Sequence, residues 1–211
     1  MIFCGNCEKR NGKIFLPYLK KYFCNACFIK IMRKRINRNI KHYKMLNNKK
    51  ISFIFDGSAP SFVCFFHIFN LLGSRKDTSF TLLSTKKALK VAKEISKKYG
   101  VMVKEIKNLK LRKTKETIVL NDCLEDTCEK LIIAFAEKKL SLINEIKPRN
   151  GNLVRPLFNI PIKEIETLAR LKNYNFLKYQ QKNIYLNKIN KVEEMRPGAK
   201  FSLVNLFESL F

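Results

Sequence analysis

Two hydrophobic periods alternate along the chain. Short apolar runs bounded by turn residues predict strands at 51–56, 79–84, 101–106 and 116–122. Apolar side chains recurring every three or four residues predict helices at 28–47, 60–72, 86–100, 124–140, 161–172 and 201–211. Pro60 is acceptable in the first turn of its helix, and Gly100 is a typical helix end. Because strands alternate with helices, the sequence predicts an α/β fold with a parallel sheet.

The chain divides into three regions by composition. Residues 1–28 form a unit bounded by two cysteine pairs, 29–50 a basic helical linker, and 51–211 the α/β domain. We find no internal repeat and no Gly/Ser-rich linker that would separate a further domain. The sequence lacks an uninterrupted apolar stretch of membrane-spanning length, and its first residues do not resemble a secretory signal.

The two cysteine pairs predict a metal site. Cys4, Cys7, Cys24 and Cys27 are spaced C-x2-C-x16-C-x2-C, which is typical of a zinc knuckle. Four thiolates complete a tetrahedral shell and leave no position for a substrate, so the expected zinc is structural. Iron–sulfur ligation is the minority alternative, and uncoordinated buried or redox-active thiols are a further one.

Positive charge is the second unusual feature. Lys and Arg number 43 against 17 Asp and Glu, giving a formal net charge of +26. Part of this excess is lysine scattered over solvated faces, but the helix that follows the cysteines concentrates basic residues. Such a cluster favours a nucleic-acid partner. The candidate RNA-binding residues are Lys30, Arg33, Lys34, Arg35, Arg38 and Lys41. Nearby aromatics could stack on bases, although packing is the favoured interpretation for Phe23 and Phe28.

The turn after the first predicted strand of the α/β domain is a candidate anion site. Asp56, Gly57, Ser58 and Ser61 belong to the segment DGSAPS, which lies where PP-loop ATP pyrophosphatases carry SGGxDS. One glycine is absent, no Asp precedes the final Ser, and Pro60 removes a backbone N–H. These departures argue against ATP binding by this chain, and an ordinary βα turn is the alternative.

The remaining reactive residue types have structural interpretations. Cys64, Cys123 and Cys128 lack paired catalytic spacing, and we expect them to be buried thiols rather than sulfur carriers. His67 lies in an apolar run and is expected to pack in the core. An acidic group at a predicted helix start provides favourable charge at the N-terminus of that helix: Glu125, Asp126 and Glu129.

Taken in order, these features resemble the cytoplasmic tRNA 2-thiolation protein 2 family. The resemblance is carried by CGNCE and YFCNACF around the cysteines, the basic run RKRINR, and ISFIFDGSAPS. LEDTCE at 124–129, RPL at 155–157 and IKEI at 162–165 extend it, as does the segment 201–211. It covers most of the chain.

This resemblance implies a PP-loop domain of the adenine nucleotide alpha hydrolase type, with a degenerate loop and a small zinc knuckle. It further implies a non-catalytic, tRNA-binding subunit that forms a cytoplasmic heterodimer with a catalytic tRNA thiolase subunit. The pair would transfer sulfur from a thiocarboxylated ubiquitin-related modifier to the wobble uridine of tRNAs for Lys, Glu and Gln.

Two alternatives stay open at the level of sequence. The chain could be an active adenylating tRNA-modification enzyme with a divergent loop, which ATP binding by the isolated chain would favour. It could instead be a zinc-ribbon RNA-binding protein without PP-loop ancestry, which the lack of a five-stranded parallel sheet would favour.

Overall fold

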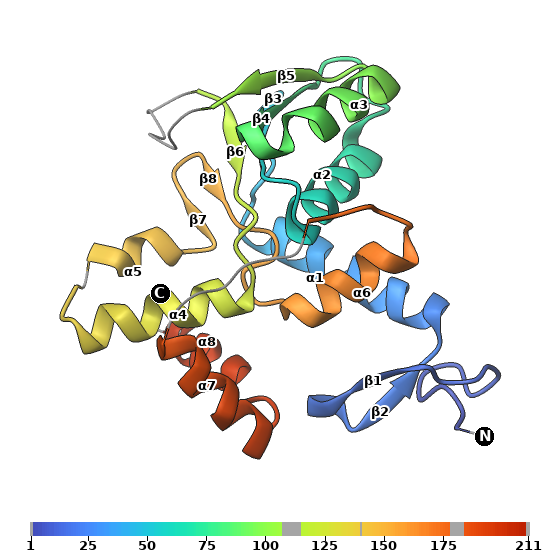
Figure 1. Ribbon diagram of the computed structural model, residues 1–211, viewed down its shortest axis with the longest axis vertical. Helices are drawn as coiled ribbons and strands as arrows, with labels where there is room; N and C mark the ends of the chain where they lie inside the picture. Colours follow the sequence, from blue (N-terminus) through green and yellow to red (C-terminus); the bar gives the residue numbers. More distant parts are fainter. Residues whose placement is uncertain (1, 107–114, 140, 178–183, 210–211) are drawn as a thin grey trace.

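A six-stranded sheet forms the centre of the molecule (Figure 1). The computed structural model describes residues 2–106, 115–139, 141–177 and 184–209. Strand order is β5-β4-β3-β6-β8-β7, and every neighbouring pair is parallel except β7 with β8. The strands are β3 (Lys50–Phe55), β4 (Ser79–Ser84), β5 (Met102–Glu105), β6 (Thr117–Val119), β7 (Arg149–Asn150) and β8 (Leu153–Val154). The described residues therefore contain five parallel strands, whose absence would have favoured the alternative of a zinc-ribbon protein without PP-loop ancestry.

The apolar run in β3 is explained by burial on both faces of the sheet. Ile51, Phe53 and Phe55 belong to the main core, whereas Ile54 packs with Ile118 in a smaller cluster on the other face. A parallel strand covered on both sides has no reason to alternate apolar with polar residues.

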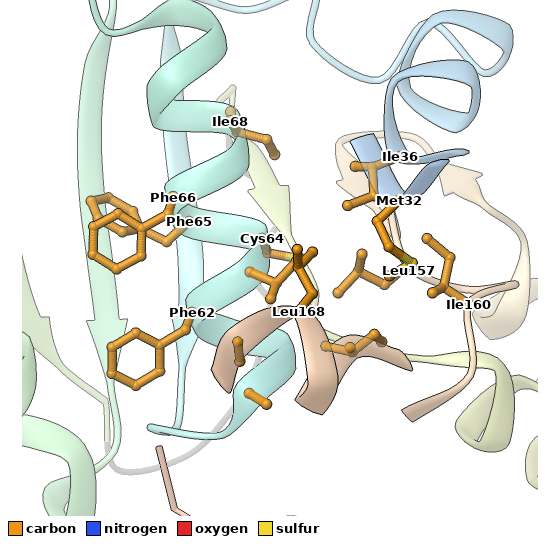
Figure 2. Packing of buried hydrophobic residues seen from close by; sticks show 14 of the residues in the cluster. Met32, Ile36, Phe62, Cys64, Phe65, Phe66, Ile68, Leu157, Ile160 and Leu168 are labelled. Carbon is orange, nitrogen blue, oxygen red and sulfur yellow. The ribbon is translucent and has the colours of Figure 1, made fainter. Parts of the chain in front are cut away.

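Four helices build the main core with the sheet. They are α1 (Asn25–His42), α2 (Ala59–Leu72), α3 (Leu89–Tyr99) and α6 (Ile162–Leu171), and a 3-10 turn, η2 (Lys86–Ala88), precedes α3. Figure 2 shows Met32 and Ile36 of α1 beside Leu157 and Ile160, with α2 and Leu168 of α6 across from them. Pro60 lies in the first turn of α2, and Gly100 ends α3 with φ of 66°, as the sequence predicts.

The remaining helices form a second cluster beside the sheet (Figure 1). They are α4 (Leu124–Ala136), α5 (Ser141–Ile146), α7 (Ile184–Met195) and α8 (Ala199–Glu208). Leu131, Phe158 and Val204 are among its buried residues. Thus α4, although it follows a strand, packs against α5, α7 and α8 instead of covering the sheet as a crossover helix of a βαβ unit would.

An antiparallel hairpin lies at the N-terminal end. Strands β1 (Ile14–Leu16) and β2 (Lys21–Phe23) are joined by a 3-10 turn, η1 (Pro17–Leu19). Helix α1 begins two residues after β2, so Cys27 lies inside the helix. The predicted helix 28–47 therefore begins too late and ends too late. The division of the chain at residues 28 and 50 stays an interpretation of the sequence.

Other element bounds also differ from the sequence prediction. The strand at 116–122 is reduced to β6, and the helix at 124–140 ends at Ala136, with residue 140 outside the described residues. The final helix begins at Ala199, and residues 210 and 211 of that prediction are not described. Six short or polar elements are not predicted at all: β1, β2, α5, β7, β8 and α7. Within the described residues, no helix combines the length and hydrophobicity that a bilayer crossing requires.

Candidate metal centre and candidate nucleic-acid interface

The four predicted cysteine ligands converge at the base of the hairpin. Their Sγ atoms all lie within 4.8 Å of one another, and those of Cys7 and Cys24 are 3.9 Å apart. Tetrahedral zinc with bonds of about 2.3 Å holds its sulfurs about 3.8 Å apart. Four thiolates are also the usual ligand set of an iron–sulfur cluster. The donor set therefore fits a metal centre with four thiolate ligands.

Local hydrogen bonding favours the thiolate form of Cys4 and Cys24. Burial raises the pKa of the Cys4 thiol, but backbone N–H groups of Cys24, Cys7 and Asn6 lower it to about 6. The pKa of Cys24 is also lowered, chiefly by the backbone N–H of Cys27. The Asn6 amide donates to Cys27 Sγ over 3.2 Å and lowers the pKa of that thiol, but burial and the neighbouring cysteines raise it to about 11. These donors are the kind that surround metal-bound sulfur, because the thiolate is the form that binds metal.

The knuckle is packed into the main core and is not suspended on a linker. Phe23 is 4% exposed and Phe28 is fully buried, which confirms the packing interpretation of these two aromatics. Cys27 and Phe28 occupy the start of α1, whose later residues Met32 and Ile36 reach the core under α2. The position of α1 is thereby coupled to the geometry of the metal centre.

Helix α1 presents most of its cationic side chains to solvent. At about 100° per residue, Lys30, Lys34 and Lys41 lie opposite the buried stripe of the helix. Arg33 and Arg38 lie on its two flanks. All five are exposed, and together they form what we call the basic face: Lys30, Arg33, Lys34, Arg38 and Lys41.

Arg35, the sixth predicted RNA-binding residue, lies away from the basic face. Its guanidinium donates to Glu164 Oε2 over 2.6 Å, to the Tyr18 hydroxyl over 3.1 Å and to the Asn159 carbonyl over 3.0 Å. The Glu164 side chain is only 7% exposed. The structure thus places Arg35 in an internal ion pair that connects α1 with α6 and the hairpin.

A cationic groove borders the basic face. It has a volume of about 980 Å³ and lies between α1 and the turn from α7 to α8. Arg38, His42 and Arg196 line it together with Asn205. In the described part of the chain, neither Arg38 nor Arg196 has a side-chain hydrogen bond or ion pair. The groove therefore extends the positive surface of α1 onto the C-terminal helices.

The predicted PP-loop position lies at the switch point of the sheet. The chain forms β3 at the centre, continues to β4 and β5 on one side, and then places β6 and β8 on the other. In such sheets, ligands bind outside the carboxyl ends of the two strands at the reversal. Asp56 directly follows β3, and Asn121 lies two residues beyond β6. The DGSAPS turn is thus where a PP-loop belongs.

An internal carboxylate fills this turn. Asp56 Oδ1 accepts the Ser58 N–H over 2.9 Å, and Asn121 Nδ2 donates to Asp56 Oδ2 over 3.0 Å. Ser61 is fully buried, and its hydroxyl donates to the Ser58 carbonyl over 2.8 Å. A backbone N–H that could bind phosphate is therefore already paired with an anion, which would also repel phosphate.

A later segment covers the same turn. Leu177 donates its N–H to the Gly57 carbonyl over 2.8 Å and forms a parallel bridge with Ser58. Gly57 has φ of 79°, and a Cβ there would meet the Leu177 side chain at 3.1 Å. A phosphate bound at this turn would therefore have to displace Asp56 from the Ser58 N–H and lie beside Leu177.

The other three cysteines are separate and buried. Cys64 is 2% exposed, and Cys123 and Cys128 are fully buried. Burial raises the pKa of all three thiols, that of Cys128 to about 12. Since the thiolate is the nucleophile, the raised pKa values disfavour the reactive form. The prediction that the three thiols are buried is confirmed, and their assignment as structural groups stays a prediction.

Residues of the RPL segment and of the acidic helix start have internal partners. Arg155 is 4% exposed, and its Nε lies 2.7 Å from Asp122 Oδ2. Asp126 accepts the Cys123 N–H at the start of α4, as expected for charge at a helix N-terminus. Glu125 has a larger role than predicted, because it binds both Lys200 Nζ and the N–H of Ile162.

Besides Arg35, sequence reasoning misplaced His67 and missed other residues. His67 is half-buried at a pocket wall, with Nε2 2.7 Å from Asn37 Oδ1, so the prediction that it packs in the core is wrong. Arg196 and Asn205 of the groove carry no local signal, because their position depends on how α7 and α8 pack. Asn121 could have been found, since it lies at the end of the strand predicted at 116–122 and thus at the same edge of a parallel sheet as Asp56.

Comparison with known proteins identifies the fold. No protein-family model and no curated protein matches the chain. The whole chain superposes on 87% of the U34-tRNA thiolase NcsA from Methanococcus maripaludis, solved with its 4Fe-4S cluster, with a TM-score of 0.81 and 15% identity. The NH3-dependent NAD synthetase from Campylobacter jejuni, solved with nitrate, gives a TM-score of 0.40 and 13% identity over 86% of this chain and 92% of its own. The predicted α/β fold with a PP-loop type parallel sheet and an N-terminal four-cysteine cluster is confirmed.

Proposed function

We propose that this protein is a non-catalytic, tRNA-binding subunit of a system that thiolates the wobble uridine of tRNA. The structural likeness to a U34-tRNA thiolase over the full chain supports the place of the protein in tRNA thiolation. The proposal adds that the chain holds tRNA and that a catalytic thiolase subunit, its heterodimer partner, activates the uridine.

The observation that carries the non-catalytic assignment is the Asp56 carboxylate inside the PP-loop position. Adenylation requires ATP phosphates at the backbone N–H groups of that turn. Here Asp56 accepts the Ser58 N–H, and Leu177 lies over Gly57. A chain with this turn retains the architecture of the fold without its anion site, which supports division of labour between two subunits.

The cysteines support the same assignment. Sulfur transfer requires a reactive thiolate or an accessible cluster. Three of the seven cysteines are buried with raised pKa values, and the other four share one centre. We propose that this centre holds structural zinc, because the spacing of its sulfurs suits a single ion. Bound zinc would supply folding free energy to the knuckle and no redox chemistry.

The basic face and the adjoining groove support tRNA contact. Arg38 belongs to both, and Arg196 adds a cation from the C-terminal helices. Exposed cations on one helix and its neighbour can neutralise several phosphates at once. We further propose, from the family resemblance, that the sulfur comes from a thiocarboxylated ubiquitin-related modifier, that the tRNAs are those for Lys, Glu and Gln, and that the complex works in the cytoplasm.

Reconstitution tests this proposal. The purified chain, the catalytic thiolase subunit and the mixture are each assayed for ATP turnover, tRNA binding and wobble thiolation. We expect the chain alone to bind tRNA without hydrolysing ATP, and thiolation to require both subunits. The control is Asp77→Ala, which removes an exposed carboxylate remote from the turn and should change none of the three assays.

Each opposite result has a defined meaning. Adenylation of tRNA by the chain alone would establish the active-enzyme alternative and reject the role of Asp56. Thiolation by the partner at full rate without this chain would remove it from the reaction. Failure of the chain to bind tRNA at low salt would reject its role as the tRNA-binding subunit.

A further inference from the structure

A second, smaller pocket lies on the opposite flank of α1 from the cationic groove. It has a volume of about 340 Å³, which is in the range of small-ligand sites. Its walls come from three helices: Arg33 and Asn37 from α1, His67 and Asn70 from α2, and Lys172 and Tyr174 at the end of α6. Val63 and Leu168 provide an apolar floor. The pocket thus combines an apolar surface, hydrogen-bonding groups and cations.

The cations of this pocket are available to a ligand. Within the described residues, the side chains of Arg33 and Lys172 form no hydrogen bond or ion pair. Both residues are exposed, and Arg33 is also part of the basic face. A phosphate at this edge could therefore meet two positive charges without breaking an existing contact.

The polar groups suit the edge of a base. His67 Nε2 lies 2.7 Å from Asn37 Oδ1, and burial together with Arg33 lowers the pKa of His67 to about 4. A neutral imidazole that donates through Nε2 keeps Nδ1 as an acceptor, and the Asn37 amino group remains a donor. Asn70 adds a second amide. Bases present donors and acceptors together, so a mixed set of this kind complements them.

An aromatic ring is held in place at the same site. Tyr174 stacks on Phe66 with ring centroids 4.6 Å apart and an interplanar angle of 22°, and on Phe62 at 5.6 Å and 20°. Burial raises the pKa of the Tyr174 phenol to about 12, so the ring is uncharged at neutral pH. A ring fixed by its neighbours offers a base a stacking surface with little loss of entropy.

We propose that this pocket receives one unstacked nucleotide of the bound RNA, with its base beside Tyr174 and Asn37 and its phosphate at Arg33 and Lys172. The inference rests on the proposed function, since it requires RNA along α1. It assigns a site to Asn37, His67, Lys172 and Tyr174, which the tRNA-binding role proposed above does not use.

The two histidines of the chain allow a direct test. In full-length protein with isotope-labelled histidine, the His67 ring resonances are followed during titration with uridine monophosphate, and separately with uridine and with inorganic phosphate. We expect a saturable His67 shift with the nucleotide at concentrations where neither fragment gives one. No shift, or the same shift with phosphate alone, would overturn the nucleotide assignment.

A matched pair of variants adds a second measurement. Lys172→Ala should weaken the nucleotide titration roughly tenfold, as expected for the loss of one charge-assisted contact. Lys163→Ala, an exposed lysine of α6 that does not line the pocket, should leave it unchanged. Equal effects of the two variants would contradict the proposal. If the protein binds tRNA but the His67 resonances do not shift with the nucleotide, the nucleotide pocket is rejected and the proposed function stands. If the protein does not bind tRNA, the proposed function itself is rejected.

Discussion

At the scale of single residues, Asp56 explains how a PP-loop architecture can lose its ligand without losing its shape. The carboxylate takes the Ser58 N–H and is held by the Asn121 amide. A turn at the end of a buried strand needs its polar groups satisfied whether or not ATP is present. Asp56 satisfies them from within the chain, so the turn is stable in the absence of nucleotide.

Replacing Asp56 should therefore destabilise the fold. Asp56→Ala leaves the Ser58 N–H and the Asn121 amide without their acceptor, and we expect the free energy of unfolding to fall by roughly 1–3 kcal/mol. Urea denaturation followed by circular dichroism measures the loss. The exposed Asp77, whose carboxylate lies 3.1 Å from Lys49 Nζ, is the control, and its alanine variant should keep a stability close to that of the wild type. Equal losses of stability in the two variants would mean that the hydrogen bonds of Asp56 do not stabilise the turn.

Arg35 and Arg38 lie on the same helix and should separate stability from RNA binding. Arg35→Ala leaves the buried Glu164 without its cation, which we expect to cost about 3 kcal/mol of unfolding free energy. Arg38→Ala, at an exposed and unpaired side chain, should change stability little and weaken tRNA binding instead. Denaturation and filter binding on both variants check this. A large stability loss for Arg38→Ala would contradict the assignment.

The loss of unfolding free energy in the Arg35→Ala variant should also depend on pH. Burial raises the pKa of Glu164 above its usual range, whereas Arg35 lowers it. Without Arg35 the folded carboxyl holds its proton at higher pH than the unfolded chain does. The variant is then penalised most above that raised pKa, and the penalty shrinks as pH falls toward about 4.3, the ordinary glutamate value. Denaturation of both proteins across this range tests the sign, and a deficit that grows toward acid would refute it.

At the scale of elements, α1 connects the metal centre, the core and the basic face. Cys27 lies in its first turn, Met32 and Ile36 are buried under α2, and the basic face covers its outer side. Order at the metal centre is therefore expected to determine how firmly the first turns of α1 are held. RNA binding along α1 would depend on it indirectly.

Loss of the metal should release the start of α1. We expect about one metal ion per chain, and Cys24→Ser should lose it and increase amide hydrogen exchange in 25–30 while the sheet stays protected. Elemental analysis and exchange mass spectrometry measure these effects. Cys64→Ala is the matched control, because this thiol belongs to α2, is buried in the core and is not one of the four ligands, so the metal content should stay intact. An iron–sulfur absorption band in the wild-type protein would show that the centre holds a cluster and would reject the assignment of zinc.

The elements that sequence could and could not predict differ in a physical way. β3, β4, α2, α3 and α6 each bury a continuous apolar run or stripe, so local pattern is sufficient. The two-residue strands β7 and β8 exist only through pairing with each other and with β6. Helix α7 is polar along much of its length and is fixed by its packing in the second cluster. Such elements are determined by tertiary contacts.

The candidate site divides along the same line. The four metal ligands are readable from spacing because each pair is local. The internal ion pair of Arg35 could not be predicted in this way, because its partner Glu164 is 129 residues away along the chain. The closure of the turn around Asp56 depends on Asn121, two residues beyond β6, and on Leu177, whose contact with the turn no local pattern indicates.

At the scale of the whole molecule, charge and shape point to the same surface. The net charge of +26 is spread over the chain, but the basic face, the cationic groove and the small pocket all adjoin α1. A polyanion lying along α1 could contact all three, whereas lysines on α3 lie beyond α2 from it (Figure 1). Clustering, more than total charge, then determines where RNA binds.

This distinction can be measured with two variants of equal charge. Lys34→Glu with Lys41→Glu reverses two cations of the basic face, and Lys93→Glu with Lys97→Glu reverses two exposed lysines of α3. Each removed phosphate contact lowers the slope of log K against log salt by about 0.7–0.9. We therefore expect the first variant to lose about 1.5 from the slope and the second to keep a slope near that of the wild type. Parallel losses in both would show that tRNA responds to net charge alone, and α1 would then be an ordinary solvated helix with no privileged contact to RNA.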